Sequence, residues 1–144
     1  MGVGIRLRRD SEWNPAGWVG RLAAGYIIPE VEGDVASQVK ARLMDMYLYP
    51  GAVADFQLET PEEIRALYRA VLRGWRAARE KGPQGWNAPE AFPDFLSTFA
   101  GLIYYIRCDP RLAGAAEKLP DGLPTFEADL PGVFPKGGGP GLLS

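Results

Sequence analysis

The sequence predicts a single α+β domain, with a short β-sheet, three to four helices and an irregular C-terminal tail. Its 144 residues are 47% apolar and 24% charged, which suits one domain with its own core. Apolar residues recur every three or four positions over several long stretches and every second position over two short ones. Proline and glycine then dominate, so we expect a domain over residues 1–126 and a flexible Pro/Gly-rich tail over 127–144.

The first elements are a strand and a glycine-rich helix. Apolar residues alternate with small or basic ones over positions 3–7, which predicts a half-buried strand. Residues 11–14 are turn-like, and Asn14 ahead of Pro15 is typical of a helix N-cap and first helical residue. Each interior glycine weakens this helix by about 1 kcal/mol relative to alanine. Its apolar stripe, the face that an amphipathic helix buries, is Trp18, Val19, Leu22 and Tyr26.

A second helix and a second strand follow. Gly33 and Asp34 open the helix, and Pro50-Gly51 ends it. Its apolar positions are Val35, Val39, Leu43 and Met46. The next apolar residues alternate with polar ones, which predicts a strand through Ala54, Phe56 and Leu58.

The clearest element is a helix from Pro61 to Lys81. Thr60 supplies a hydroxyl cap and Glu63 stands three residues after it, which is the arrangement of a capping box. Gly82 and the proline after it end the helix. The apolar face matches the helical period throughout and consists of Ile64, Leu67, Tyr68, Val71, Leu72 and Trp75.

A loop over residues 82–93 leads into a segment that is apolar nearly all round, from Asp94 to Arg107. The length of this segment favours one buried helix, whereas the run Ile103–Ile106 leaves open a helix followed by a strand; we expect one helix. The loop tryptophans Trp13 and Trp86 suit two roles equally. They either fasten their loops to the core or anchor a binding partner.

Composition excludes several classes of function. The chain has no histidine, which excludes histidine-dependent catalytic triads, histidine zinc sites and haem bound through imidazole. Its single cysteine excludes an internal disulfide and a cysteine metal cluster, and it fits a reducing cytoplasmic location. The net charge of −2 argues against a nucleic-acid partner, and the longest apolar run is too short to cross a membrane. The sequence has no glycine-rich phosphate loop, and its acidic clusters match no catalytic or metal-binding motif. We therefore expect no catalytic, cofactor-binding or metal-binding residue.

Two charged groups and one aromatic residue are candidate partner-binding residues. Each charged group is also typical of ordinary solvated surface. One group is a row of arginines on a single face of the long helix, with Trp86 a few residues beyond its end. The other is an alternating acidic loop. The candidates are Arg65, Arg69, Arg73, Arg76 and Trp86, and on the acidic loop Glu30, Glu32 and Asp34.

Four features of the chain occur in a recognisable order. They are the start Met1-Gly-Val-Gly-Ile5, the helix end Arg42-Leu-Met-Asp-Met-Tyr47 followed by Pro50-Gly51, the long helix Glu62–Arg79 and the apolar segment Phe95–Ile106. In this order of elements the chain resembles a family of small immunity proteins from bacterial polymorphic toxin systems. The resemblance covers roughly residues 1–107 and implies tight binding to a cognate toxin, with no catalytic residues to transfer.

The sequence therefore predicts a non-catalytic bacterial binding protein of immunity type, located in the cytoplasm and partnered by a toxin. Two alternatives stay open. One is a histidine-free enzyme that uses a carboxylate such as Asp55, with Arg69 or Arg73 as an anion clamp. The other is a structural or assembly subunit that associates through its apolar segments.

Overall fold

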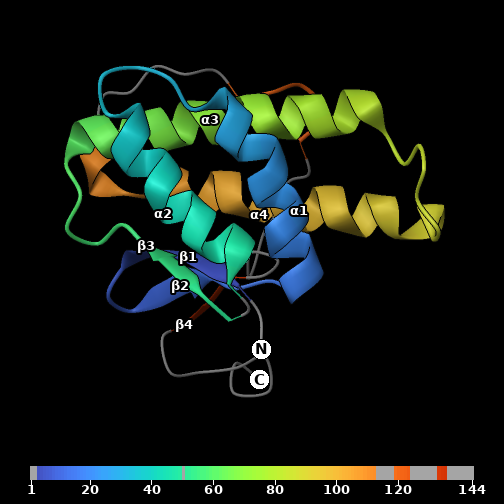
Figure 1. Ribbon diagram of the computed structural model, residues 1–144, viewed down its shortest axis with the longest axis horizontal. Helices are drawn as coiled ribbons and strands as arrows, with labels where there is room; N and C mark the ends of the chain where they lie inside the picture. Colours follow the sequence, from blue (N-terminus) through green and yellow to red (C-terminus); the bar gives the residue numbers. More distant parts are fainter. Residues whose placement is uncertain (1–2, 50, 113–118, 124–132, 136–144) are drawn as a thin grey trace.

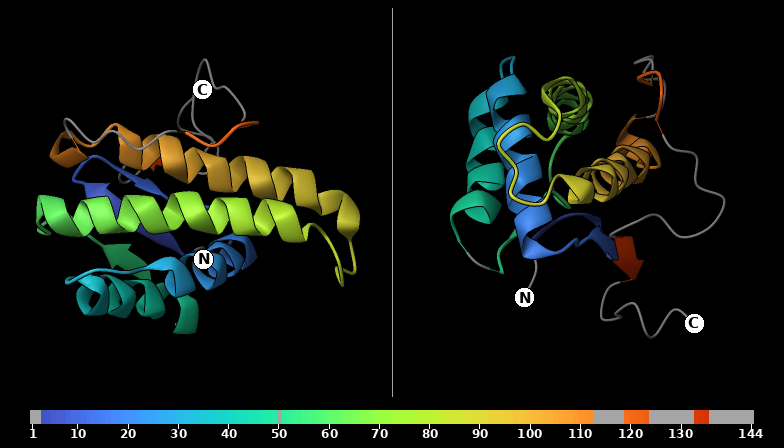
Figure 2. Two further views of the ribbon diagram at one scale, coloured as in Figure 1. Left: turned by 90° about the horizontal axis from the view of Figure 1, so that it is seen from above. Right: turned by 90° about the vertical axis from the view of Figure 1, so that its right-hand side faces the viewer.

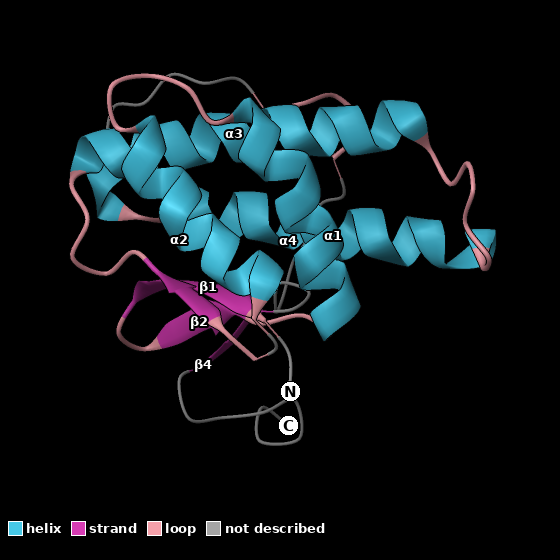
Figure 3. Ribbon diagram, in the orientation of Figure 1, coloured by secondary structure: helices cyan, strands magenta, loops and turns pink. Residues whose placement is uncertain are grey.

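The computed structural model describes residues 3–49, 51–112, 119–123 and 133–135. These residues form an α+β domain, as predicted, in which four helices stand on a small sheet (Figure 1, Figure 3). The helices are α1 (Gly17–Ile27), α2 (Ala36–Leu48), α3 (Pro61–Lys81) and α4 (Phe92–Arg107), and the strands are β1 (Gly4–Arg8), β2 (Ser11–Trp13), β3 (Val53–Asp55) and β4 (Val133–Pro135).

The sheet is mixed and its strand order is β3-β1-β2-β4. β2 is antiparallel to both β1 and β4, whereas β1 and β3 are parallel. A parallel pair needs a long crossover connection, and the segment that contains α1 and α2 supplies it. The alternation predicted over residues 3–7 is confirmed, because Val3, Ile5 and Leu7 are all buried.

The turn predicted over residues 11–14 is wrong, because three of these residues form β2. Trp13 is fully buried, and its indole N–H donates to the carbonyl of Thr98 in α4 at 3.0 Å. Glu12 forms an ion pair with Arg6 of β1 at 2.8 Å. Local composition indicated a turn, but contacts with a distant helix and a neighbouring strand decide the structure.

α1 packs against both α2 and α3, and α3 also packs against α4 (Figure 2). α3 contacts all three other helices and lies farthest from the sheet. Its start is as predicted: the Thr60 hydroxyl accepts a hydrogen bond from the Glu63 N–H at 3.2 Å. Its whole predicted apolar face is buried. α4 is one continuous helix, so the alternative of a helix followed by a strand is wrong.

α1 differs most from the prediction. It begins at Gly17 rather than at Pro15, and its small residues rather than its large ones face the core. A Cβ at Gly20 would lie 2.2 Å from Val3 Cγ2, so this glycine lets the helix approach β1 closely. The buried residues of α1 are Val19, Gly20, Ala23, Ala24 and Ile27. Three members of the predicted stripe, Trp18, Leu22 and Tyr26, are instead exposed or half-buried.

Two other segments also depart from expectation. The second strand is shorter than predicted: it ends at Asp55, and Leu58 is 97% exposed. α2 begins at Ala36, two residues after the predicted opening, and its Val39, Leu43 and Met46 are buried as predicted. Most of the predicted tail lies outside the described residues, but within it β4 pairs with β2 and adds a fourth strand to the sheet.

A polar cluster around Arg111 joins the segment after α4 to β1 and to the segment that follows β3. The Arg111 guanidinium donates to the carbonyls of Leu7, Phe56 and Glu59 at 2.6–3.0 Å and pairs with Asp109 at 2.8 Å. Burial opposes ionisation of Asp109, but the hydrogen bonds and charge of Arg111 outweigh it and keep the pKa of that carboxyl below its ordinary value. Because Arg111 satisfies carbonyls from two separate segments, we assign this cluster a structural role.

Candidate functional site

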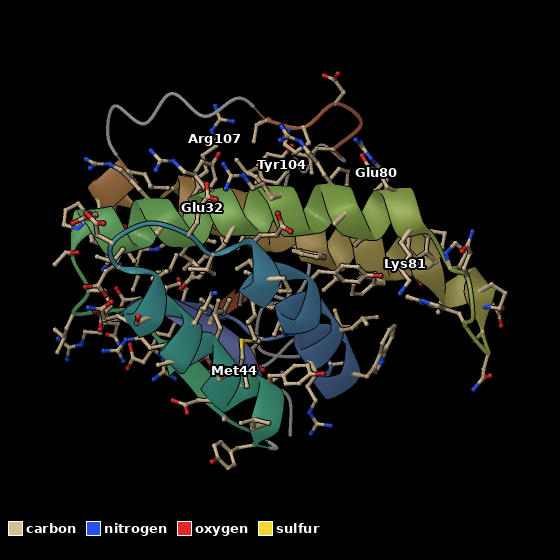
Figure 4. The ribbon with its side chains drawn as sticks, turned by 45° about the horizontal axis from the view of Figure 1, so that its top comes forward. Glu32, Met44, Glu80, Lys81, Tyr104 and Arg107 are labelled. Carbon is tan, nitrogen blue, oxygen red and sulfur yellow. The ribbon has the colours of Figure 1, made fainter. Side chains whose placement is uncertain are left out.

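The two charged groups singled out in the sequence lie next to each other. Arg73 of α3 forms an ion pair with Glu32, which stands in the connection between α1 and α2, at 2.5 Å. Figure 4 shows Glu32 against the α3 ribbon. Both side chains are largely exposed, so the pair contributes at most about 1 kcal/mol. Each group therefore neutralises part of the charge of the other.

The other members of the two groups lie on open surface. Arg65, Arg69 and Arg76 are exposed on the outer face of α3. Glu30 is half-buried in a short 3₁₀ turn after α1, and Asp34 is exposed. None of these five residues lines either groove described below.

Trp86 lies elsewhere, in a cluster of aromatic rings at the other end of α3. Its ring is edge-on to Phe92 and Phe95, with centroids 5.3 and 5.6 Å away. It is also edge-on to Trp18 of α1, at 6.2 Å. Trp86 is half-buried, so it fastens its loop to α4 and still presents part of its ring at the surface. The contacts with Phe92 and Phe95 show the first role expected for a loop tryptophan, and the role of partner anchor stays a prediction.

Beside this cluster the surface is hollowed by a groove of about 640 Å³, which we call the aromatic groove. Its residues come from α1, from the end of α2 and from the last turn of α3. Trp18 and Tyr47 form open walls, 51% and 45% exposed. Gly25 lines the groove without a side chain, and a Cβ there would lie 3.6 Å from Tyr47 Cε2. The lining residues are Trp18, Arg21, Leu22, Gly25, Tyr26, Tyr47 and Lys81.

A second, smaller groove of about 270 Å³ lies on the other side of Trp18. Trp18 and Leu22 line both grooves, so the indole stands as a ridge between them. One face of this indole stacks on the buried Phe95, with ring centroids 6.3 Å apart and planes 27° apart. The ridge is therefore held in place before any partner arrives. The smaller groove is completed by Trp86, Asn87, Ala88 and Ala91.

The charge at the aromatic groove is positive. Arg21 and Lys81 line it, and no carboxylate of the described residues does. Within the described part of the chain, neither cation has an ion-pair partner. Glu80, the acidic neighbour of Lys81 in sequence, lies on the opposite side of the α3 ribbon (Figure 4). The groove thus joins aromatic walls to two unpaired cations.

The residues predicted to serve an enzyme or an assembly subunit lie outside the two grooves. Asp55 sits in β3 and accepts hydrogen bonds from the backbone and side chain of Gln57 at 3.0–3.2 Å, while Arg73 is paired with Glu32. The apolar segment of α4 is buried inside the domain and so is not presented for self-association. Among the described residues, no three acidic or cysteine side chains gather as a metal site, and none of the helices could span a bilayer.

Comparisons with protein-family models, with curated proteins and with solved structures find no match for this chain. The two grooves are therefore the features of the molecule from which a function is inferred. Of the residues predicted to bind a partner, only Trp86 lines either groove. The sequence signal for this surface is the helical spacing of the small residues Gly20, Ala23 and Ala24 in α1, because small residues buried on one face leave the large ones outside.

Proposed function

We propose that this protein is a non-catalytic binding protein of immunity type, which neutralises a toxin by binding it through the aromatic groove and its neighbour. The observation that carries the proposal is the Trp18 ridge, a half-exposed indole fixed by Phe95 between two grooves. Tryptophan, tyrosine and arginine dominate the binding energy of protein interfaces, and all three line this surface.

The surface also suits a large partner better than a small ligand. Pockets for small molecules bury most of the ligand, whereas these grooves are open and their walls are half exposed. The exposed apolar surface continues past Tyr47 to Leu48 and Tyr49, which are 54% and 59% exposed. A protein partner could cover this whole area, and a ridge that is already ordered loses little conformational entropy when it binds.

The test is co-expression in bacteria with the polypeptide encoded by the gene adjacent to that of this protein. We expect the wild-type protein to restore growth that the polypeptide arrests and to bind it in calorimetry. Trp18→Ala should weaken binding about 30-fold or more, as expected for a hot-spot residue. Leu58→Ala is the matched control, because it removes an exposed apolar side chain outside both grooves.

Two results would count against the proposal. If the wild-type protein neither binds the polypeptide nor restores growth, the immunity role is wrong. If it does both and Trp18→Ala matches Leu58→Ala, the role stands but the partner binds elsewhere. The arginine row or the acidic loop would then be the next surface to test.

A further inference from the structure

The side chains that line the aromatic groove determine which chemical group binds there favourably. Its walls are aromatic, and the polar groups at its edge include the cations Arg21 and Lys81, which no described carboxylate neutralises. An aromatic or large apolar side chain fills such a space favourably, and a carboxylate beside it gains from both cations. A basic neighbour would be repelled by the same two groups.

From this, and building on the proposed function, we infer that the partner inserts an aromatic side chain flanked by carboxylates, carried on an acidic segment of a protein. The two grooves share the Trp18 ridge, so a chain segment can place one side chain on each side of it. A free aromatic acid would fill only one groove and leave much of its own surface in water. The openness of the grooves therefore favours a segment of polypeptide.

The acidic loop and the aromatic groove suit toxin surfaces of opposite charge. A toxin that acts on nucleic acid presents a basic surface, which would suit the acidic loop Glu30–Asp34 instead. The aromatic groove requires an acidic patch on the partner, and Arg73 already engages Glu32 of the acidic loop. We therefore place the main contact at the aromatic groove and away from the basic surface of such a toxin.

The chemistry can be tested without the toxin by using two ligands with the same ring and opposite charge. Indole-3-acetate and tryptamine are titrated into ¹⁵N-labelled protein, and the Gly25 amide and Trp18 indole signals report binding. We expect indole-3-acetate to bind about tenfold more tightly, because two exposed cations attract one ligand and repel the other. Arg21→Glu with Lys81→Glu should reverse the preference.

The matched control is Arg65→Glu with Arg76→Glu, which changes the net charge equally on exposed surface outside the grooves. This control should keep the preference for indole-3-acetate. Equal affinity for the two ligands, or a control that loses the preference as completely as the groove variant, would overturn the inference. Either result would leave the co-expression test of the immunity role unaffected.

A third arm identifies the source of the carboxylate. An end-capped eight-residue peptide with one central phenylalanine among aspartates should bind at least as tightly as indole-3-acetate. A peptide with lysines in place of the aspartates should bind about tenfold more weakly. If indole-3-acetate binds more than tenfold more tightly than the acidic peptide, the groove takes a free aromatic acid and the inference of a protein segment is wrong.

Discussion

Filling the floor of the aromatic groove should stabilise the protein and impair its binding. Gly25 lies in the last turn of α1, and among the described residues a Cβ at this position would contact Tyr47 Cε2 alone, at 3.6 Å. That distance is an ordinary van der Waals contact. Gly25→Ala therefore introduces no strain and gains the intrinsic helix preference of alanine, about 1 kcal/mol. For a domain of this length we expect the melting temperature to rise by about 2–4 °C.

The same substitution five residues earlier should have the opposite effect. A Cβ at Gly20 would lie 2.2 Å from Val3 Cγ2 and 3.2 Å from the Val3 carbonyl oxygen. Valine is stiff at χ1, so the helix must move away from β1, which costs about 1–3 kcal/mol. The two variants add the same methyl group to the same helix, and only its surroundings differ.

Urea unfolding of both variants, followed by tryptophan fluorescence, measures the contrast. Titration with the acidic peptide should show weaker binding for Gly25→Ala, because its methyl group projects into the groove. A destabilised Gly25→Ala variant, or a Gly20→Ala variant as stable as the wild type, would mean that the orientation assigned to α1 is wrong. Unchanged peptide affinity in Gly25→Ala would mean that the peptide does not use the groove floor.

Three further predictions concern stability. Trp75→Ala should cost about 3–5 kcal/mol because the indole is 1% exposed, whereas the exposed Arg76→Ala should change the urea midpoint little. Similar shifts for the two would contradict the face assigned to α3. Arg111→Ala should cost about 3–5 kcal/mol at neutral pH because it leaves the Asp109 carboxylate buried without its partner. In the wild type the lowered pKa of Asp109 stabilises the fold above about pH 4, and this contribution is lost as the pH falls through the lowered value. The stability difference between Arg111→Ala and the wild type should therefore shrink in acid-unfolding experiments. A hydrogen bond with the Glu59 carboxyl, together with burial, raises the pKa of Glu63, so the stability that this group contributes is present at acidic pH and lost as the pH rises through the raised value. Glu63→Gln should therefore gain stability relative to the wild type between pH 4 and pH 7. A stability difference that stays constant over this range would refute the assignment.

The sequence predicts best those elements whose signals are local. α3 carries its own cap, its own stop and a complete apolar face, so its bounds and the burial of that face follow from the sequence alone. α4 is long and apolar, and its burial needs no further information. The strand through Val3, Ile5 and Leu7 is likewise evident from its alternation.

What the sequence does not predict depends on contacts between distant segments. In α1, both a stripe of large residues and a stripe of small ones have helical spacing, and close packing on Val3 selects the small one. The aromatic groove then joins Trp18 to Tyr47 and Lys81, which come from three helices. No local pattern places these residues side by side. The pairing of Arg73 with Glu32 is likewise a contact 41 residues apart in the sequence.

The Arg111 cluster affects when the chain can fold during its synthesis on the ribosome. Leu7, on the central strand, leaves the ribosome 104 residues ahead of the guanidinium that binds its carbonyl. At about 5–20 residues per second, that separation lasts on the order of 5–20 s. Throughout this interval β1 exists without one of the groups that will hold it to the segment before α3. We expect the native fold to form late in synthesis, so that arrest of translation before Arg111 yields a nascent chain that proteases degrade.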